Sequence, residues 1–143
     1  MGERNAVEIL ENQWSLNNFV SVGLDSSDGL LMRAVIDETL DLVCGFKPNT
    51  EPYFVKGPAG FEILQANLFH IRDRAPNLLT ILDRKAGDIG DTNIYTVEMA
   101  FKYLGVDAIT VNPYAGGQAF APFLDHANKL IIFLCRSSNP EAG

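Results

Sequence analysis

The sequence has few basic residues, few cysteines and no long hydrophobic segment. Lys and Arg together number 11, against 18 Asp and Glu, so the formal net charge is −7. An acidic chain has no general electrostatic attraction for a phosphate backbone, which argues against nucleic-acid binding. The longest apolar runs extend over only a few residues, so no segment is predicted to span a membrane.

Cysteine usage and the first residues indicate the cellular compartment. Cys44 and Cys135 lie far apart, each in an apolar run, so we expect both to be buried and reduced rather than disulfide-bonded. The opening residues, MGERNAVEIL, lack the basic flank and apolar core of a secretory signal. Together these features predict a cytoplasmic protein.

A length of 143 residues with 47% hydrophobic residues fits one globular domain, residues 1–143. Five apolar runs are predicted to be strands, and none alternates cleanly between apolar and polar residues, as expected for strands buried on both faces of a parallel sheet. These runs are Phe19–Leu24, Leu42–Phe46, Leu78–Leu82, Ala108–Val111 and Leu130–Cys135.

Segments with helical periodicity separate the predicted strands. Apolar residues recur at helical spacing around residues 7–14, 31–35, 61–71, 94–104 and 120–124. Alternating strands and helices with short connections indicate an α/β fold with parallel strands. Two architectures fit: a complete flavodoxin-like sheet, or about five units of a (β/α)₈ barrel, which typically needs about 250 residues. Periodicity does not distinguish them.

The predicted strands end in polar residues, including two lysines. Lys47 follows the second strand, and the third is followed by Asp83-x-Lys85-x-x-Asp88. Residues two apart on a strand point to one side, so Asp83 and Lys85 are expected to face one pocket, with Asp88 reaching it from the turn. Two carboxylates would keep the Lys85 ammonium protonated, which favours a proton donor over a Schiff-base nucleophile. A solvated surface cluster of ion pairs explains the same spacing.

Other chemistry-bearing residues give weaker signals. His70 and His126 have no partner at metal-ligand spacing, so they are interpreted as packing or surface residues, and no metal site is predicted. Trp14 is interpreted as a packing residue. The chain contains neither a G-x-x-x-x-G-K-[ST] phosphate loop nor a G-x-G-x-x-G motif after a strand.

Five strand-end motifs together resemble one enzyme family. The signature D-x-K-x-x-D-I-G-x-T is complete at residues 83–92. It is accompanied by V-G-L-D, F-K-P-N, T-V-N-P-Y and R-S-S-N-P at residues 22–25, 46–49, 110–114 and 136–140. This set resembles the orotidine 5′-phosphate decarboxylases, in the branch distinct from the shorter archaeal type. The resemblance implies a (β/α)₈ barrel, decarboxylation of orotidine 5′-phosphate to UMP in pyrimidine biosynthesis, no metal or cofactor, and a homodimer.

The resemblance also implies roles for individual residues. Lys85 would donate the proton to C6 of the pyrimidine, and Asp83 would lie beside the departing carboxylate. Asp88 and Thr92 would reach into the neighbouring subunit's site. The remaining residues would bind substrate: Asp25 and Lys47 at the ribose hydroxyls, Ile89 in the pyrimidine wall, Ser138 at the pyrimidine amide edge, and Asn112 at the end of the fourth strand.

The resemblance also predicts that residues 1–143 lack the phosphate-binding part of the barrel. The family's phosphate-binding residues follow strands seven and eight, and this sequence covers only about the first five units. We therefore expect residues 1–143 to be part of a longer barrel and inactive by themselves. Two alternatives stay open: a Mg²⁺-dependent sugar-phosphate decarboxylase or aldolase of the same barrel superfamily, and a complete flavodoxin-like binding domain.

Overall fold

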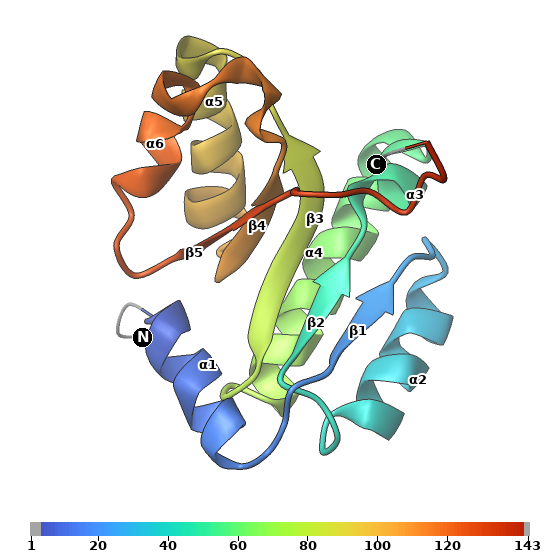
Figure 1. Cartoon of the computed structure of the whole chain (residues 1–143). Helices are drawn as coiled ribbons and strands as arrows, with labels where there is room; N and C mark the ends of the chain where they lie inside the picture. Colours follow the sequence, from blue (N-terminus) through green and yellow to red (C-terminus); the bar gives the residue numbers. More distant parts are fainter. Residues whose placement is uncertain (1–3, 142–143) are drawn as a thin grey trace.

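Strands and helices alternate along the chain in the computed structural model, which describes residues 4–141 (Figure 1). The strands are β1 (Ser21–Leu24), β2 (Gly45–Pro48), β3 (Leu79–Ala86), β4 (Ala108–Val111) and β5 (Leu130–Phe133). The α-helices are α1 (Ala6–Ser15), α2 (Gly29–Thr39), α3 (Thr50–Phe54), α4 (Gly57–Arg74), α5 (Gly90–Val97) and α6 (Ala121–Leu124). A π-helical turn, η1 (Glu98–Tyr103), extends α5, and two 3₁₀ turns, η2 (Pro113–Ala115) and η3 (Gly117–Phe120), precede α6.

The five strands are parallel and lie in the sheet in their sequence order, β1-β2-β3-β4-β5. A flavodoxin-like sheet has the order 2-1-3-4-5, so this topology rules out the flavodoxin-like alternative. Consecutive parallel strands with helical crossovers are the arrangement found in a (β/α)₈ barrel. Within residues 4–141, β1 and β5 each pair on one side only, so the sheet is an open arc.

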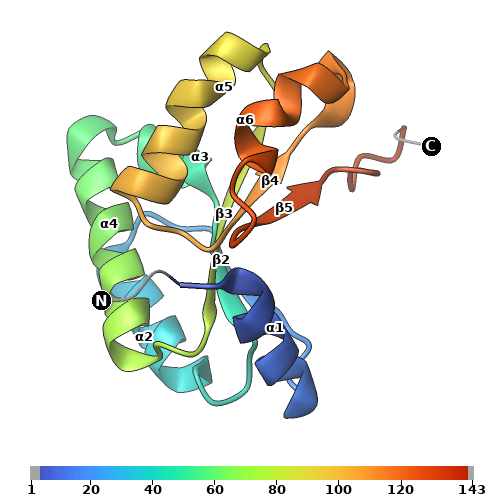
Figure 2. The same cartoon turned by 90° about the vertical axis from the view of Figure 1, so that its left-hand side faces the viewer.

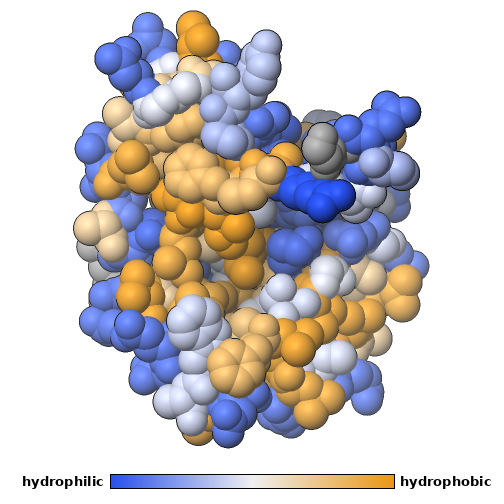
Figure 3. Space-filling model, viewed as in Figure 1, coloured by the Kyte–Doolittle hydropathy of each residue, from blue (hydrophilic) through white to orange (hydrophobic). Residues whose placement is uncertain are grey.

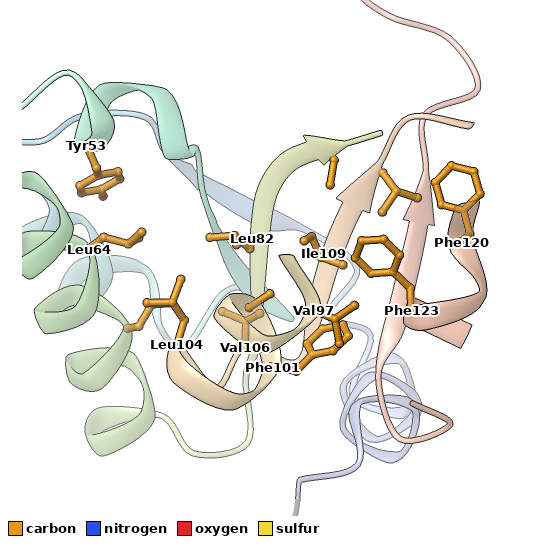
Figure 4. Packing of buried hydrophobic residues seen from close by; sticks show 14 of the residues in the cluster. Tyr53, Leu64, Leu82, Val97, Phe101, Leu104, Val106, Ile109, Phe120 and Phe123 are labelled. Carbon is orange, nitrogen blue, oxygen red and sulfur yellow. The ribbon is translucent and has the colours of Figure 1, made fainter. Parts of the chain in front are cut away.

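The helices pack on one face of this sheet, and α1 lies against the other (Figure 2). Leu82 of β3 and Ile109 of β4 pack with residues of α4, α5, η1 and α6 in the largest hydrophobic cluster (Figure 4). On the opposite face, Leu79 and Ile81 pack with Ala6 of α1. The alternation along β3 therefore assigns odd-numbered residues to the face away from α4.

The face away from α4 carries exposed hydrophobic side chains. Figure 3 shows hydrophobic residues gathered in the middle of the view that Figure 1 presents. Ile132 of the edge strand β5 is 40% exposed on this face, whereas the next residue, Phe133, points to the helix side and packs against Phe120. Among the described residues, no further strand pairs with β5 on its outer side.

The strand positions predicted from apolar runs need several corrections. The second strand begins at Gly45 rather than Leu42, whose side chain is 69% exposed, and the third continues to Ala86. Cys44 is buried as predicted, but Cys135 is exposed because it lies beyond the end of β5. Trp14, expected to pack, is 48% exposed on the outer side of α1. Within residues 4–141, no helix is both long and apolar enough to cross a membrane.

Candidate active site

The site lies at the carboxyl end of the sheet, on the face away from α4. Phe46 and Leu82 turn toward the helices and are fully buried in the hydrophobic clusters. The residues that follow them, Lys47 and Asp83, therefore emerge on the other face. An isolated bridge between Asn49 and Asp83 continues the pairing of β2 and β3 to this level.

A single carboxylate bridges two lysines. The Asp83 Oδ2 atom lies 2.8 Å from Lys47 Nζ, and Oδ1 lies 2.6 Å from Lys85 Nζ. The Asp83 side chain is 10% exposed, whereas those of Lys47 and Lys85 are 32% and 48% exposed. The two ammonium groups thus open to solvent on either side of a nearly buried anion.

The environment of Asp83 keeps this carboxyl group ionised. Burial alone would raise its pKa, because a charged group loses its hydration. Hydrogen bonds from Lys47, Lys85 and Thr110 outweigh burial, so the pKa of Asp83 lies below its usual value.

Asp88 does not join this cluster, contrary to the sequence prediction of two carboxylates around one ammonium. Its side chain is exposed, and its Oδ1 atom accepts a hydrogen bond from the backbone N–H of Ile89 at 2.7 Å. The turn after β3 carries the carboxylate away from Asp83. Asp88 and Thr92 instead line, with Lys85, a surface depression of about 360 Å³.

The other predicted substrate-binding residues are spread around the same end of the sheet. Asp25 is exposed directly after β1, and Asn112 follows β4, where its side chain accepts a hydrogen bond from the N–H of Tyr114 at 3.2 Å. Ile89 is 64% exposed and lines a second depression next to η3. Ser138 is exposed on the segment after β5, which projects from the sheet (Figure 2). The structure therefore brings Lys47, Asp83 and Lys85 into contact, but not the other residues.

Sequence reasoning missed two polar residues beside the site. Thr110 donates a hydrogen bond to Asp83 Oδ1 at 3.0 Å, and Asn93 is fully buried and donates to the carbonyl oxygens of Asp88 and Ala119, both at 2.8 Å. The contact of Thr110 with Asp83 follows from the register, because Leu82 pairs with Ile109 and the next residues are then neighbours, but the sequence alone does not give this register. Asn93 carried no signal in the sequence, because α5 contains several other polar residues.

Neither histidine is part of the site. His70 Nε2 lies 2.9 Å from Asp37 Oδ1 between α4 and α2, and the His126 ring packs edge-on against Phe101. Within residues 4–141, no group of three or more His, Cys, Asp or Glu side chains is arranged to hold a metal ion.

Comparison with known proteins identifies the family. Residues 18–143 match the model of the orotidine 5′-phosphate decarboxylase / HUMPS family. The chain is 44% identical over 108 residues to an orotidine 5′-phosphate decarboxylase of Herpetosiphon aurantiacus, covering 76% of this chain and 39% of that protein. It is 39% identical over 150 residues to the enzyme of Dechloromonas aromatica, covering 94% of this chain and 54% of that protein.

Solved structures agree with the topology. The Leishmania donovani OMP decarboxylase superposes with a TM-score of 0.88 at 27% identity, covering 95% of this chain and 55% of that chain. The predicted fold, part of a (β/α)₈ barrel, is thereby confirmed. The chain spans about half the length, or less, of the curated relatives named above. By the match over residues 18–143 and by these relatives, the chain belongs to the orotidine 5′-phosphate decarboxylase / HUMPS family.

Proposed function

We propose that the protein containing this chain decarboxylates orotidine 5′-phosphate to UMP. The observation that carries the proposal is the row Lys47–Asp83–Lys85, a buried anion between two ammonium groups at the carboxyl end of a parallel sheet. Active sites of (β/α)₈ barrels form at this end of the strands. Relatives of 39% and 44% identity that are named orotidine 5′-phosphate decarboxylases support the choice of substrate.

In the proposed reaction, the bond between C6 and the carboxylate carbon breaks, and CO₂ leaves. The electron pair of that bond stays on C6, where negative charge develops. The Lys85 ammonium stabilises this charge and then transfers a proton from Nζ to C6, giving UMP, and the neutral amine recovers a proton from water. No group that accepts electrons is required, because a fixed positive charge lies where negative charge develops.

Asp83 supports this chemistry through its contacts with both lysines. Its carboxylate holds Lys85 Nζ at 2.6 Å and Lys47 Nζ at 2.8 Å, so both cations are positioned before substrate binds. Such preorganisation lowers the barrier because the charges need no rearrangement during the reaction. We assign Lys47 and Asp25 to the ribose hydroxyls, Ile89 to the pyrimidine wall and Ser138 to the pyrimidine amide edge. Asn112 is assigned to substrate binding at the end of β4.

We further propose that the enzyme is a cytoplasmic homodimer with shared active sites. Asp88 and Thr92 are both exposed, and they line the depression that Lys85 also borders. A second subunit bound at this depression would receive these two side chains beside its own Lys85. Residues 1–143 would form part of a single barrel domain.

Residues 1–143 by themselves are proposed to be inactive. The described sheet has two unpaired strands at its edges, so it does not enclose the substrate. Binding energy from the substrate phosphate supports the chemical step, and an open arc cannot supply phosphate contacts from further strands. Purified residues 1–143 that formed a soluble monomer with normal turnover would contradict this proposal.

The activity is tested by ultraviolet absorbance, which follows the loss of orotidine 5′-phosphate. The full-length polypeptide encoded by the gene is purified, and its activity is assayed before and after treatment with EDTA. We expect substrate loss at the same rate in both samples. Loss of activity on chelation, together with turnover of a hexulose phosphate, would favour the sugar-phosphate alternative, and no turnover of orotidine 5′-phosphate would refute the proposal.

A further inference from the structure

The strand that carries Lys85 is irregular at the site. Leu82 pairs with Ile109 and Ala86 pairs with Val111, so residues 83–85 of β3 lie opposite Thr110 alone on β4. Extra residues in one strand form a bulge, which interrupts the ladder and redirects side chains. Asp83 and Lys85 both lie in this bulge, and both belong to the ion-paired row described above.

The bulge places Lys85 in an unfavourable backbone conformation. Its φ angle is +50°, in the left-handed region that is unfavourable for a residue with a Cβ atom. Such conformations persist only where surrounding contacts impose them, and they are concentrated at functional sites. Contacts with neighbouring residues must therefore hold residues 83–85 in this conformation.

The Thr110 hydroxyl is the group that holds it. Its Oγ1 atom accepts hydrogen bonds from the backbone N–H groups of Arg84 at 3.1 Å and Lys85 at 2.9 Å. It donates its own hydrogen to Asp83 Oδ1 at 3.0 Å. A hydroxyl has one donor and two acceptor positions, so all of its hydrogen-bonding capacity is used by the bulge.

Asp83 Oδ1 connects this hydroxyl to the reacting ammonium. The same oxygen that accepts from Thr110 also lies 2.6 Å from Lys85 Nζ. Thr110 therefore contacts Lys85 from two directions, directly at its backbone N–H and indirectly through the carboxylate that holds its ammonium. The Thr110 side chain is half-buried between these groups.

We propose that Thr110 is a positioning residue that sets the backbone of the bulge and the place of the Lys85 ammonium. It acts through Asp83 and Lys85 without touching the reacting atoms. This proposal rests on the proposed decarboxylase function, in which Lys85 protonates C6. A valine at this position would preserve the shape of the side chain. It would leave the backbone N–H groups of Arg84 and Lys85 without this acceptor, and Asp83 Oδ1 with Lys85 Nζ but without the hydroxyl.

The test compares Thr110→Val with Thr110→Ser in the polypeptide as its gene encodes it. We expect Thr110→Val to lower kcat for orotidine 5′-phosphate by about 10- to 100-fold, because a small displacement of a catalytic group slows the chemical step by up to about 100-fold. We expect KM to change by less than about threefold. Thr110→Ser keeps the hydroxyl and should retain kcat within about threefold. A Thr110→Val protein with kcat within about twofold of wild type would overturn the proposal.

The control is Thr80→Val, which removes a chemically similar hydrogen bond on the neighbouring strand β3. The Thr80 hydroxyl donates to the buried Asp107 Oδ2 at 2.9 Å. Losing it should lower the midpoint of thermal unfolding but leave kcat unchanged. If Thr80→Val lowered kcat as much as Thr110→Val, the effect would be one of general stability, and the positioning role would be refuted.

A second readout separates this proposal from the proposed function. NMR titration of the Asp83 carboxyl carbon should show a higher pKa in Thr110→Val than in wild type, with the wild-type value restored in Thr110→Ser, because the hydroxyl bond favours the ionised form. This measurement needs no turnover. A wild-type protein without decarboxylase activity would refute the function, whereas an unchanged pKa in Thr110→Val would refute the role of Thr110.

Discussion

Replacing Arg4 by Met should destabilise the fold strongly, because Arg4 supplies the positive charge for a buried carboxylate at the far end of the sheet from the site. The Asp107 side chain is 0% exposed and accepts hydrogen bonds from Arg4 Nε at 2.8 Å and Nη2 at 2.9 Å. The N–H and hydroxyl groups of Thr80 donate to the same carboxylate, each at 2.9 Å. In Arg4→Met the neutral donors remain, but the charged partner is lost.

The size of the effect follows from this burial. Removing one partner of a buried ion pair costs about 3–5 kcal/mol, because the remaining charge is uncompensated. The Arg4 side chain is 23% exposed, so water screens the pair in part, and we expect the lower end of that range, about 3 kcal/mol. For a domain of this size, that loss corresponds to a decrease of roughly 10 °C in the midpoint of thermal unfolding.

Urea unfolding of the wild type, Arg4→Met and the control Arg33→Met provides the measurement. Arg33 is exposed on α2, and its replacement should change the free energy of unfolding by less than about 0.5 kcal/mol. The double variant Arg4→Met with Asp107→Asn should recover part of the loss, because it no longer buries an unpaired charge. A loss below about 1 kcal/mol in Arg4→Met would refute the reasoning.

The buried contacts around the site predict three further outcomes. Because the pKa of Asp83 is lowered in the folded state, its carboxylate stabilises the fold above its unfolded-state pKa of about 3.9, and this contribution is lost as the pH falls through the folded-state value. The free energy of unfolding, measured with urea, should therefore decrease less between about pH 6 and pH 3 in Asp83→Asn than in wild type. Gly60→Ala would place a Cβ atom against the backbone oxygen of Tyr53 in α3 and should lower the free energy of unfolding by about 1–3 kcal/mol. Gly117→Ala, whose Cβ atom would meet open space, should be nearly neutral in the same unfolding assay. Asn93→Leu removes the donor for two loop carbonyl groups and should cost about 1–3 kcal/mol, so an unchanged unfolding midpoint would contradict the role given to its amide.

The sequence predicts the three central strands well because β2, β3 and β4 each contain a run of buried apolar residues. The edge strands β1 and β5 are apolar as well, but they are only partly buried. Phe46 and Leu82 are fully buried, as the runs containing them indicate. The strand limits were less predictable. Leu42 is apolar but exposed, and the third strand continues through charged residues to Ala86 because its neighbours in the sheet supply hydrogen bonds.

The site was predictable in part, for a physical reason. Lys47 and Asp83 could be placed together because the carboxyl ends of adjacent parallel strands meet at one edge. The position of Asp88 and the left-handed conformation of Lys85 could not, since both depend on the bulge in β3. That bulge is held by Thr110, which lies 25 residues from Lys85 in the sequence, and no local pattern reports such a contact.

The central claim is that Lys85 donates the proton that completes decarboxylation. The most direct test is turnover of orotidine 5′-phosphate by Lys85→Ala, measured by proton NMR of the pyrimidine H6 signal that appears in UMP, with Lys102→Ala as the control. Lys102 is an exposed lysine that pairs with Glu98 on η1, away from the site. We predict that Lys85→Ala folds and produces no detectable UMP, while Lys102→Ala retains wild-type turnover. A folded Lys85→Ala protein with turnover near that of the wild type would contradict the account.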